Sequence, residues 1–216
     1  MSSTLTYDGM LALLASVADD MIATRDTLTE LDAVLGDGDL GRTIDRGFRG
    51  IKEALTEAAE AADRDLGKML FRQGKAFANA APSSFGALMG TAFMKGGMAL
   101  KGQSEATTED LTRAMQTALE ALMERGKAEI GNKTMLDALH PAIEATRAGL
   151  AADPDMTLAA YFRAAADAAN AGAEKTRNMQ SQIGRASWQG ERSIGQMDPG
   201  AKAVALMLDA AARHFE

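Results

Sequence analysis

Residues that favour β-strands are scarce in this chain of 216 residues, and their scarcity restricts the fold more than any other feature. Valine occurs only at Val17, Val34 and Val204, aromatic residues make up 5% of the chain, and alanine is abundant. Strands favour β-branched and aromatic side chains, whereas alanine has the highest helix propensity. Apolar residues also recur at helical spacing, as they do through residues 48–55. The sequence therefore predicts an all-α fold.

We expect eight helices, packed antiparallel through short connections, in a single domain that covers residues 1–216. Residues typical of helix ends mark several boundaries. Asp198 and Pro199, for example, are typical of an N-cap followed by proline at the first helical position. No Ser/Gly-rich linker or clear internal repeat divides the chain. The expected helices lie near residues 6–27, 42–62, 65–80, 84–101, 108–127, 133–150, 156–178 and 199–215.

The net charge of -7 and the isoelectric point near 5.0 argue against nucleic acid or an anionic membrane as a partner. No stretch reaches the roughly 18 apolar residues needed to span a bilayer, and residues 1–8 lack the basic start of a secretion signal. We therefore expect a soluble cytoplasmic protein. The absence of cysteine excludes disulfides and thiolate chemistry, and neither His140 nor His214 is expected to be a catalytic base.

Three aspartates, Asp32, Asp37 and Asp39, flank a tight turn that contains several glycines. Carboxylates brought together repel one another unless a cation lies among them. Hard oxygen ligands of this kind suit magnesium, which commonly shares its coordination shell with phosphate. The turn therefore indicates a metal that holds a phosphorylated ligand, and a purely structural Asp-Gly turn is the alternative. The glycines that permit the turn are Gly36, Gly38 and Gly41.

Two segments of small residues lead into expected helices and could bind phosphate through free backbone N–H groups. The first opens the expected helix at 42–62 with Gly41, Arg42 and Thr43. The second, residues 82–87, contains two serines that either cap the following helix or bond to a phosphate.

The segment 126–137 approaches the spacing of a P-loop, but Asn132 intrudes before Lys133. A P-loop also follows a buried strand, whereas an expected helix precedes this segment, so we reject a P-loop here. Lys133 is then interpreted as a surface charge. The segment 183–200 is long enough to be a functional lid or disordered, and its Arg185 and Arg192 are either phosphate clamps or solvated side chains.

Taken together, these segments resemble the nucleotide-binding L subunit, or L domain, of dihydroxyacetone kinases. The matching stretches extend over nearly the whole chain, and the set is more specific than any one member. They include Gly36-Asp37-Gly38-Asp39, Lys133-Thr134-Met135-Leu136-Asp137, Gly184-Arg185-Ala186-Ser187 and residues 28–32, 90–93, 141–142, 190–195 and 198–201. The resemblance implies a barrel of eight antiparallel helices with the nucleotide bound at one end.

The resemblance also implies a set of site residues. Asp32, Asp37 and Asp39 would bind two magnesium ions that bridge the phosphates of ADP or ATP. The remaining nucleotide contacts would come from Leu40, Gly41, Arg42, Thr43, Ser83, Ser84 and Phe85 near the phosphates, from Gly126 and Met135 near the adenine, and from a closing segment with Arg185, Asp198, Pro199 and Gly200.

The implied activity is phosphoryl transfer from the bound nucleotide to dihydroxyacetone or a related ketose. In that family a separate K subunit holds the substrate, so this chain would need a K-type partner. The phosphoryl donor would be ATP or a phosphotransferase-system protein that recharges ADP. The sequence leaves open which ketose is used, which donor acts, and whether the chain forms a homodimer.

Three departures from the family pattern bear on that assignment. Leu40 stands where histidine or threonine is common, and Asn132 replaces an aspartate. An ungapped alignment puts Phe85 where serine is usual, whereas a one-residue shift puts Ser84 there. The alternative function is a non-catalytic, nucleotide-binding regulatory subunit. A magnesium-dependent hydrolase or prenyl-diphosphate enzyme is disfavoured, because their aspartates usually lie at helical spacing and Asp37 and Asp39 are two apart in a turn.

Overall fold

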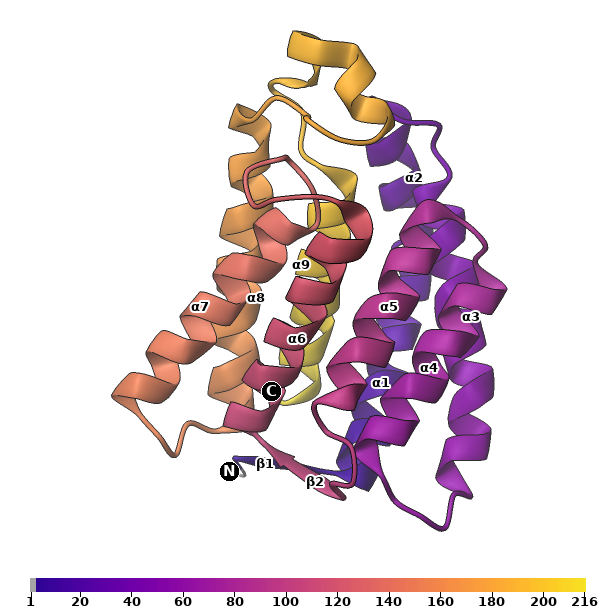
Figure 1. The fold of residues 1–216 in the computed structure, drawn as a ribbon, viewed down its shortest axis with the longest axis vertical. Coiled ribbons are helices and arrows are strands. Elements are labelled where there is room, and N and C mark those ends of the chain that lie inside the picture. The colour runs from indigo at the N-terminus through magenta and orange to yellow at the C-terminus, as the bar shows by residue number, and fades with distance from the viewer. Residues whose placement is uncertain (1–2) are drawn as a thin grey trace.

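The computed structural model describes residues 3–216, and this part of the chain contains nine α-helices (Figure 1). The helices are α1 Tyr7–Ala23, α2 Arg25–Ala33, α3 Leu40–Ala59, α4 Leu66–Ala80, α5 Ser84–Met98, α6 Thr108–Gly126, α7 Leu136–Ala152, α8 Leu158–Lys175 and α9 Pro199–His214. Two 3₁₀ segments, η1 Thr176–Asn178 and η2 Arg185–Ser193, lie between α8 and α9, and two short strands, β1 Thr4–Thr6 and β2 Glu105–Thr107, pair antiparallel. The predicted all-α architecture is confirmed.

The eight long helices form a closed ring in which each packs on its neighbours in sequence. The ring closes because α1 packs on both α3 and α9, and the short helix α2 lies at one end (Figure 1). Since successive long helices run in opposite directions, α3, α5, α7 and α9 all begin at the same end, the upper end in Figure 1. We call this the open end of the barrel.

Apolar helix faces fill the interior of the barrel. Phe48, Phe77 and Tyr161 are among its largest fully buried side chains, and the rings of Phe48 and Phe77 meet edge to face with their centroids 5.4 Å apart. No helix within residues 3–216 is both long enough and apolar enough to cross a membrane.

The helix expected over residues 6–27 is divided in the structure, which corrects that prediction. α1 ends at Ala23, and the side chain of Thr24 donates to the carbonyl of Met21 at 2.7 Å. α2 then extends the helical region to Ala33, where no helix was expected. Leu28 is the only buried residue of α2, so this helix lacks the apolar stripe by which helices are predicted from sequence.

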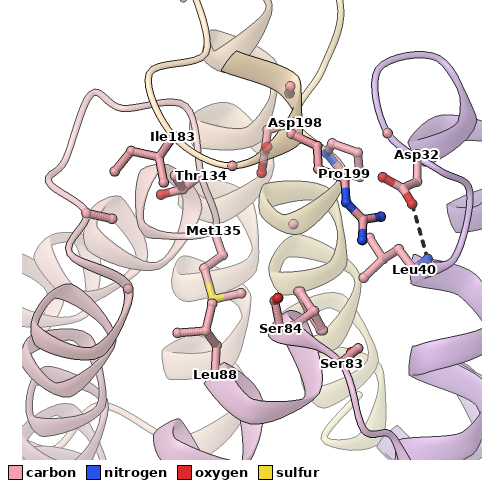
Figure 2. A pocket seen from close by; sticks show the side chains of 18 of the residues that line it. Asp32, Leu40, Ser83, Ser84, Leu88, Thr134, Met135, Ile183, Asp198 and Pro199 are labelled. Atoms are coloured by element: carbon pink, nitrogen blue, oxygen red, sulfur yellow. Dashed lines mark hydrogen bonds between the residues drawn. The ribbon is translucent and has the colours of Figure 1, made fainter. Parts of the chain in front are cut away.

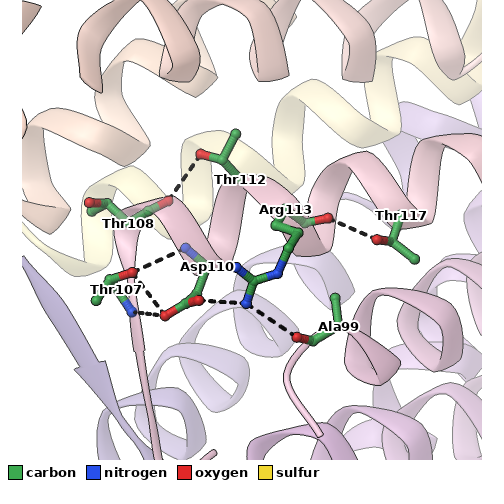
Figure 3. A network of polar contacts seen from close by, with 7 residues as sticks. All are labelled: Ala99, Thr107, Thr108, Asp110, Thr112, Arg113 and Thr117. Carbon is green, nitrogen blue, oxygen red and sulfur yellow. Dashed lines mark hydrogen bonds and ion pairs between the residues drawn. The ribbon is translucent and has the colours of Figure 1, made fainter. Parts of the chain in front are cut away.

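The two strands were not predicted, because each has only three residues. β2 leads directly into α6, whose start is fixed by reciprocal capping between Thr107 and Asp110 (Figure 3). The N–H of Asp110 donates to Oγ1 of Thr107 at 3.1 Å, and the N–H of Thr107 donates to Oδ2 of Asp110 at 3.0 Å. Arg113 joins Asp110 to the carbonyl of Ala99, which ties the end of α5 to the first turn of α6.

Helices α4 and α5 are in direct backbone contact through paired glycines. A Cβ on Gly74 would lie 2.6 Å from the carbonyl oxygen of Gly90, and a Cβ on Gly90 would lie 2.8 Å from that of Gly74. Gly67 and Gly97 repeat the same reciprocal contact, at 2.6 and 2.8 Å, two helical turns away. Only glycine allows this spacing, so these four positions fix how closely the two helices pack.

Candidate functional site

A cavity of about 550 Å³ lies at the open end of the barrel (Figure 2). This volume falls within the range of roughly 300–1,000 Å³ that is typical of small-molecule sites. Its lining comes from the aspartate turn, the starts of α3, α5 and α9, the end of α6 and the segments around 133 and 184. The lining residues are Asp32, Leu35, Gly36, Asp37, Asp39, Leu40, Pro82, Ser83, Ser84, Phe85, Leu88, Leu122, Gly126, Ala128, Lys133, Thr134, Met135, Leu136, Ile183, Gly184, Arg185, Ala186, Asp198, Pro199 and Gly200.

Three carboxylates converge at one side of this cavity. One oxygen of each of Asp32, Asp37 and Asp39 lies within 4.8 Å of the other two. Asp32 also accepts a hydrogen bond from the N–H of Leu40 at 3.2 Å (Figure 2), and the guanidinium of Arg185 contacts Asp37. Three hard oxygen donors at this separation are a chemically suitable ligand set for a divalent cation such as Mg²⁺.

Glycines hold the aspartates in this arrangement. Gly38 has a φ of +68°, a left-handed conformation that favours glycine, and a Cβ on Gly36 would lie 2.3 Å from Oδ1 of Asp32. A purely structural Asp-Gly turn would use its carboxylates to bond backbone N–H groups. Asp39 occupies the N-cap of α3 but makes no side-chain capping bond, so its carboxylate does not serve that structural role.

Four helix N-termini meet the cavity, because the antiparallel barrel places the starts of alternate helices at the open end. They contribute Leu40 of α3, Ser84 of α5, Leu136 of α7 and Pro199 of α9. The first turn of a helix presents unpaired N–H groups and a partial positive charge. Their convergence beside an acidic, cation-binding cluster is suited to a ligand that carries several phosphates.

The opposite part of the cavity is apolar. Leu88, Met135 and Ile183 face it in Figure 2, and Leu122 and Ala128 complete this wall. A wall of this kind suits a flat aromatic base. Of these residues the sequence identified only Met135, although helical spacing gave a signal, since Leu88 lies one turn after Ser84 and Leu122 lies one turn before Gly126.

The structure brings together all the predicted site residues except Gly41, Arg42 and Thr43, which are not among the lining residues. Gly41 is packed against α2, where a Cβ would lie 2.0 Å from the carbonyl oxygen of Arg25. Arg42 is exposed, and Thr43 is buried with its hydroxyl donating to Ser83 at 3.2 Å. Their direct contact with a phosphate stays a prediction.

The interpretation of Lys133 as a surface charge is wrong. Its exposed fraction is 2%, and its ammonium donates hydrogen bonds to backbone carbonyls of the segment 179–196. The rejection of a P-loop is confirmed, because α6 and not a strand precedes this segment. Asp137 organises the loop instead, accepting from the N–H groups of Gly131 at 2.5 Å and Thr134 at 2.7 Å.

The segment 179–196 crosses the open end of the barrel, and we call it the cap (Figure 1). It is not structureless, since Arg185–Ser193 form 3₁₀ turns interrupted at Gly190. Arg185 enters the cavity lining, whereas Arg192 is exposed and lies outside that lining. Trp188, the only tryptophan, is 88% exposed on the cap.

The family profile of the DAK2 domain matches residues 34–213, which is most of the chain. The chain belongs to the DAK2 domain family. This DAK2 domain is 35% identical over 181 residues to the "PEP-dependent dihydroxyacetone kinase, ADP-binding subunit DhaL" of Escherichia coli K12, covering 84% of each chain. It is also 35% identical over 190 residues to an L-erythrulose 1-kinase of Mycolicibacterium smegmatis, where it covers 87% of this chain and 32% of that protein.

The fold of this DAK2 domain is also similar to that of a solved kinase. The crystal structure of the dihydroxyacetone kinase from C. freundii in complex with AMP-PNP and Mg²⁺ matches with a TM-score of 0.71 and 29% sequence identity. The match covers 94% of this chain and 33% of that one. It supports the prediction of the barrel architecture made from the sequence.

Asp198 gives this DAK2 domain a pH-dependent stability that one substitution should remove. Burial raises the pKa of Asp198 from 3.8 to about 7, and the neighbouring Asp137 carboxylate adds to the rise. The folded state therefore binds this proton more tightly than the unfolded state, so the free energy of unfolding falls as pH rises from about 4 to 7 and the loss is complete above pH 7.

Asp198→Asn should abolish that contribution while keeping the N-cap, in which the side chain accepts from Ala201 at 2.7 Å. We expect the variant to be more stable than the wild type by about 1–2 kcal/mol at pH 8. At pH 4 the two proteins should be nearly equal. Urea unfolding at both values measures the difference, and an equal difference at the two pH values would contradict the assignment.

Proposed function

We propose that this chain is the nucleotide-binding subunit of a kinase for dihydroxyacetone or a related ketose, and that the cavity at the open end binds ADP or ATP. The observation that carries this proposal is the aspartate cluster beside four converging helix N-termini. The relatives support the same function, since those matched over 84–96% of their own length are named ADP-binding subunits of dihydroxyacetone kinases.

Asp32, Asp37 and Asp39 are the residues proposed to hold magnesium. The three side chains offer six carboxylate oxygens, which suffice for two ions when nucleotide phosphates and waters complete the coordination shells. Bound magnesium neutralises phosphate charge as a phosphoryl group leaves. The bond from Leu40 N–H to Asp32 orients one carboxylate of the cluster.

The remaining residues are proposed to position the nucleotide. The phosphates lie against the starts of α3 and α5, near Leu40 and Ser84, and the adenine lies against the apolar wall around Met135. Arg185 on the cap can reach phosphate oxygens because it already contacts Asp37 beside them. The departures Leu40 and Phe85 both line the cavity, where they add apolar surface close to the expected phosphates.

A K-type subunit is the proposed partner, because phosphoryl transfer needs an acceptor and, in the family that the chain resembles, a separate K subunit holds it. The cavity is open at the barrel end, so a phosphate held there can be reached by an acceptor on another chain. The relatives matched over 84–96% of their own length are named PEP-dependent, which favours a phosphotransferase-system protein as the donor that recharges ADP.

Reconstitution with a K-type subunit tests the function. We expect dihydroxyacetone phosphate to form when the chain is mixed with that subunit, dihydroxyacetone, Mg²⁺ and either ATP or the phosphotransferase proteins with phosphoenolpyruvate. A mixture without the chain should form none. Tight nucleotide binding without transfer to any ketose tested would instead identify a regulatory subunit and reject the kinase assignment.

A further inference from the structure

Lys133 is a buried cation that lines the cavity but is not among the predicted nucleotide contacts. An ammonium group carries three N–H donors and no acceptor. The ammonium of Lys133 donates to the carbonyl oxygens of Met179 at 3.0 Å, Ser193 at 2.5 Å and Gln196 at 2.6 Å. All three donors are therefore used, and all three acceptors belong to the cap.

These three carbonyls lie at the two ends of the cap, which we call its feet. Met179 is the first residue of the cap, and Ser193 and Gln196 lie at its C-terminal end. Lys133 itself belongs to the loop between α6 and α7, so one side chain joins both feet to a third part of the chain. The N–H of Gln182 adds a bond to the carbonyl of Asn132 at 3.2 Å on the same loop.

The backbone conformation of Lys133 and the burial of its charge are both unfavourable for a lysine. Its φ of +62° lies in the left-handed region, which costs free energy for a residue with a side chain. Burial also removes its charge from water and lowers its pKa, an effect that the carboxylate of Asp198 opposes. A lysine held under these conditions indicates that the ammonium, with its three donors, is needed there.

We propose that Lys133 is a positioning residue that fastens both feet of the cap and so places Arg185 over the aspartate cluster. Arg185 contacts Asp37 from the cap, and its place depends on the feet, because the backbone N–H groups that bond the cap to the rest of the described chain belong to residues 179, 182 and 195, at or beside the feet. The inference rests on the proposed function only in that the cavity under the cap holds a nucleotide. Without the ammonium, the cap should open more often and the nucleotide should leave faster.

The chain permits a chemical rescue, because it has no cysteine of its own. Lys133→Cys introduces a single thiol, which can be alkylated in the unfolded chain before refolding. Alkylation with 2-bromoethylamine restores an ammonium at lysine length, and alkylation with 2-bromoethanol gives a neutral group of the same length. The two products differ in charge and donors but hardly in size.

We expect the product with the ammonium to release Mg-ADP at close to the wild-type rate, and the neutral product to release it about tenfold faster or more. Fluorescence anisotropy of Trp188, measured without nucleotide, should fall in the neutral product, because the only tryptophan lies on the cap. Equal release rates and equal anisotropy in the two products would overturn the proposal. A wild type that binds no Mg-ADP would reject the proposed function, while the anisotropy would still test the cap.

Hydrogen exchange on a second variant, Lys133→Met, covers the case in which the alkylated chains do not refold. Faster exchange confined to residues 179–196 is expected, with α1 and α4 unchanged. Exchange that rises evenly over the barrel would show a role in general stability and would overturn the proposal. Lys75→Met, which removes an exposed lysine from α4, is the matched control and should leave exchange in the cap unchanged.

Discussion

Replacing Asp37 with asparagine is expected to weaken magnesium-dependent ADP binding by about 100-fold or more, because one carboxylate of the cation site is lost. Asp39→Asn should have a similar effect. Both substitutions keep the size of the side chain and remove the charge that attracts the cation. Isothermal titration with ADP, at saturating Mg²⁺ and again with EDTA, measures the loss. Wild type and variants should bind equally weakly without the cation.

The fold should survive these substitutions, which separates a binding defect from unfolding. Asp37 is exposed, its ion pair with Arg185 is also exposed, and pairs of that kind contribute about 1 kcal/mol at most. Neutralising one of three neighbouring carboxylates also removes repulsion. Glu30→Gln removes an exposed charge from α2 and should leave ADP binding unchanged. Unchanged magnesium-dependent affinity in both aspartate variants would refute the metal assignment.

The aspartate turn could be predicted from the sequence because its chemistry is local. Asp37 and Asp39 lie within a few residues of Gly36 and Gly38, so turn geometry alone brings their carboxylates together. The helices were predictable for a related reason, since an apolar stripe repeats within each of them. α2 was missed because it buries only Leu28.

Residues whose role depends on distant partners could not be predicted in the same way. Lys133 reads as a surface charge until the fold brings the carbonyl of Gln196, 63 positions away, within 2.6 Å of its ammonium. Leu88 and Ile183 share the apolar wall only because the cap, which carries Ile183, crosses the end of the barrel at which α5 begins. Thr43 also depends on a distant partner, since its bond to Ser83 links the start of α3 to the start of α5.

A methyl group at Gly74 is expected to lower the free energy of unfolding by about 2 kcal/mol and the melting temperature by about 4–8 °C. The new Cβ would lie 2.6 Å from the carbonyl oxygen of Gly90 and 2.9 Å from the backbone nitrogen of Met94, so α4 and α5 must move apart. Helix propensity alone predicts the opposite sign, a gain of roughly 0.5–1 kcal/mol for glycine to alanine. Urea unfolding and calorimetry therefore decide between close helix packing and propensity.

Gly126→Ala is the matched control, because a Cβ at that helical position would meet only Leu88, at an ordinary 3.6 Å, and Ala128, at 3.8 Å. The control should stay within about 1 kcal/mol of the wild type. A double-mutant cycle then tests whether Gly74 and Gly90 share one contact. Once Gly74→Ala has separated α4 from α5, adding Gly90→Ala should cost less than it does alone, since the same gap accommodates both methyl groups. Additive losses would show that the two glycines act independently and that the helices do not respond as a rigid pair.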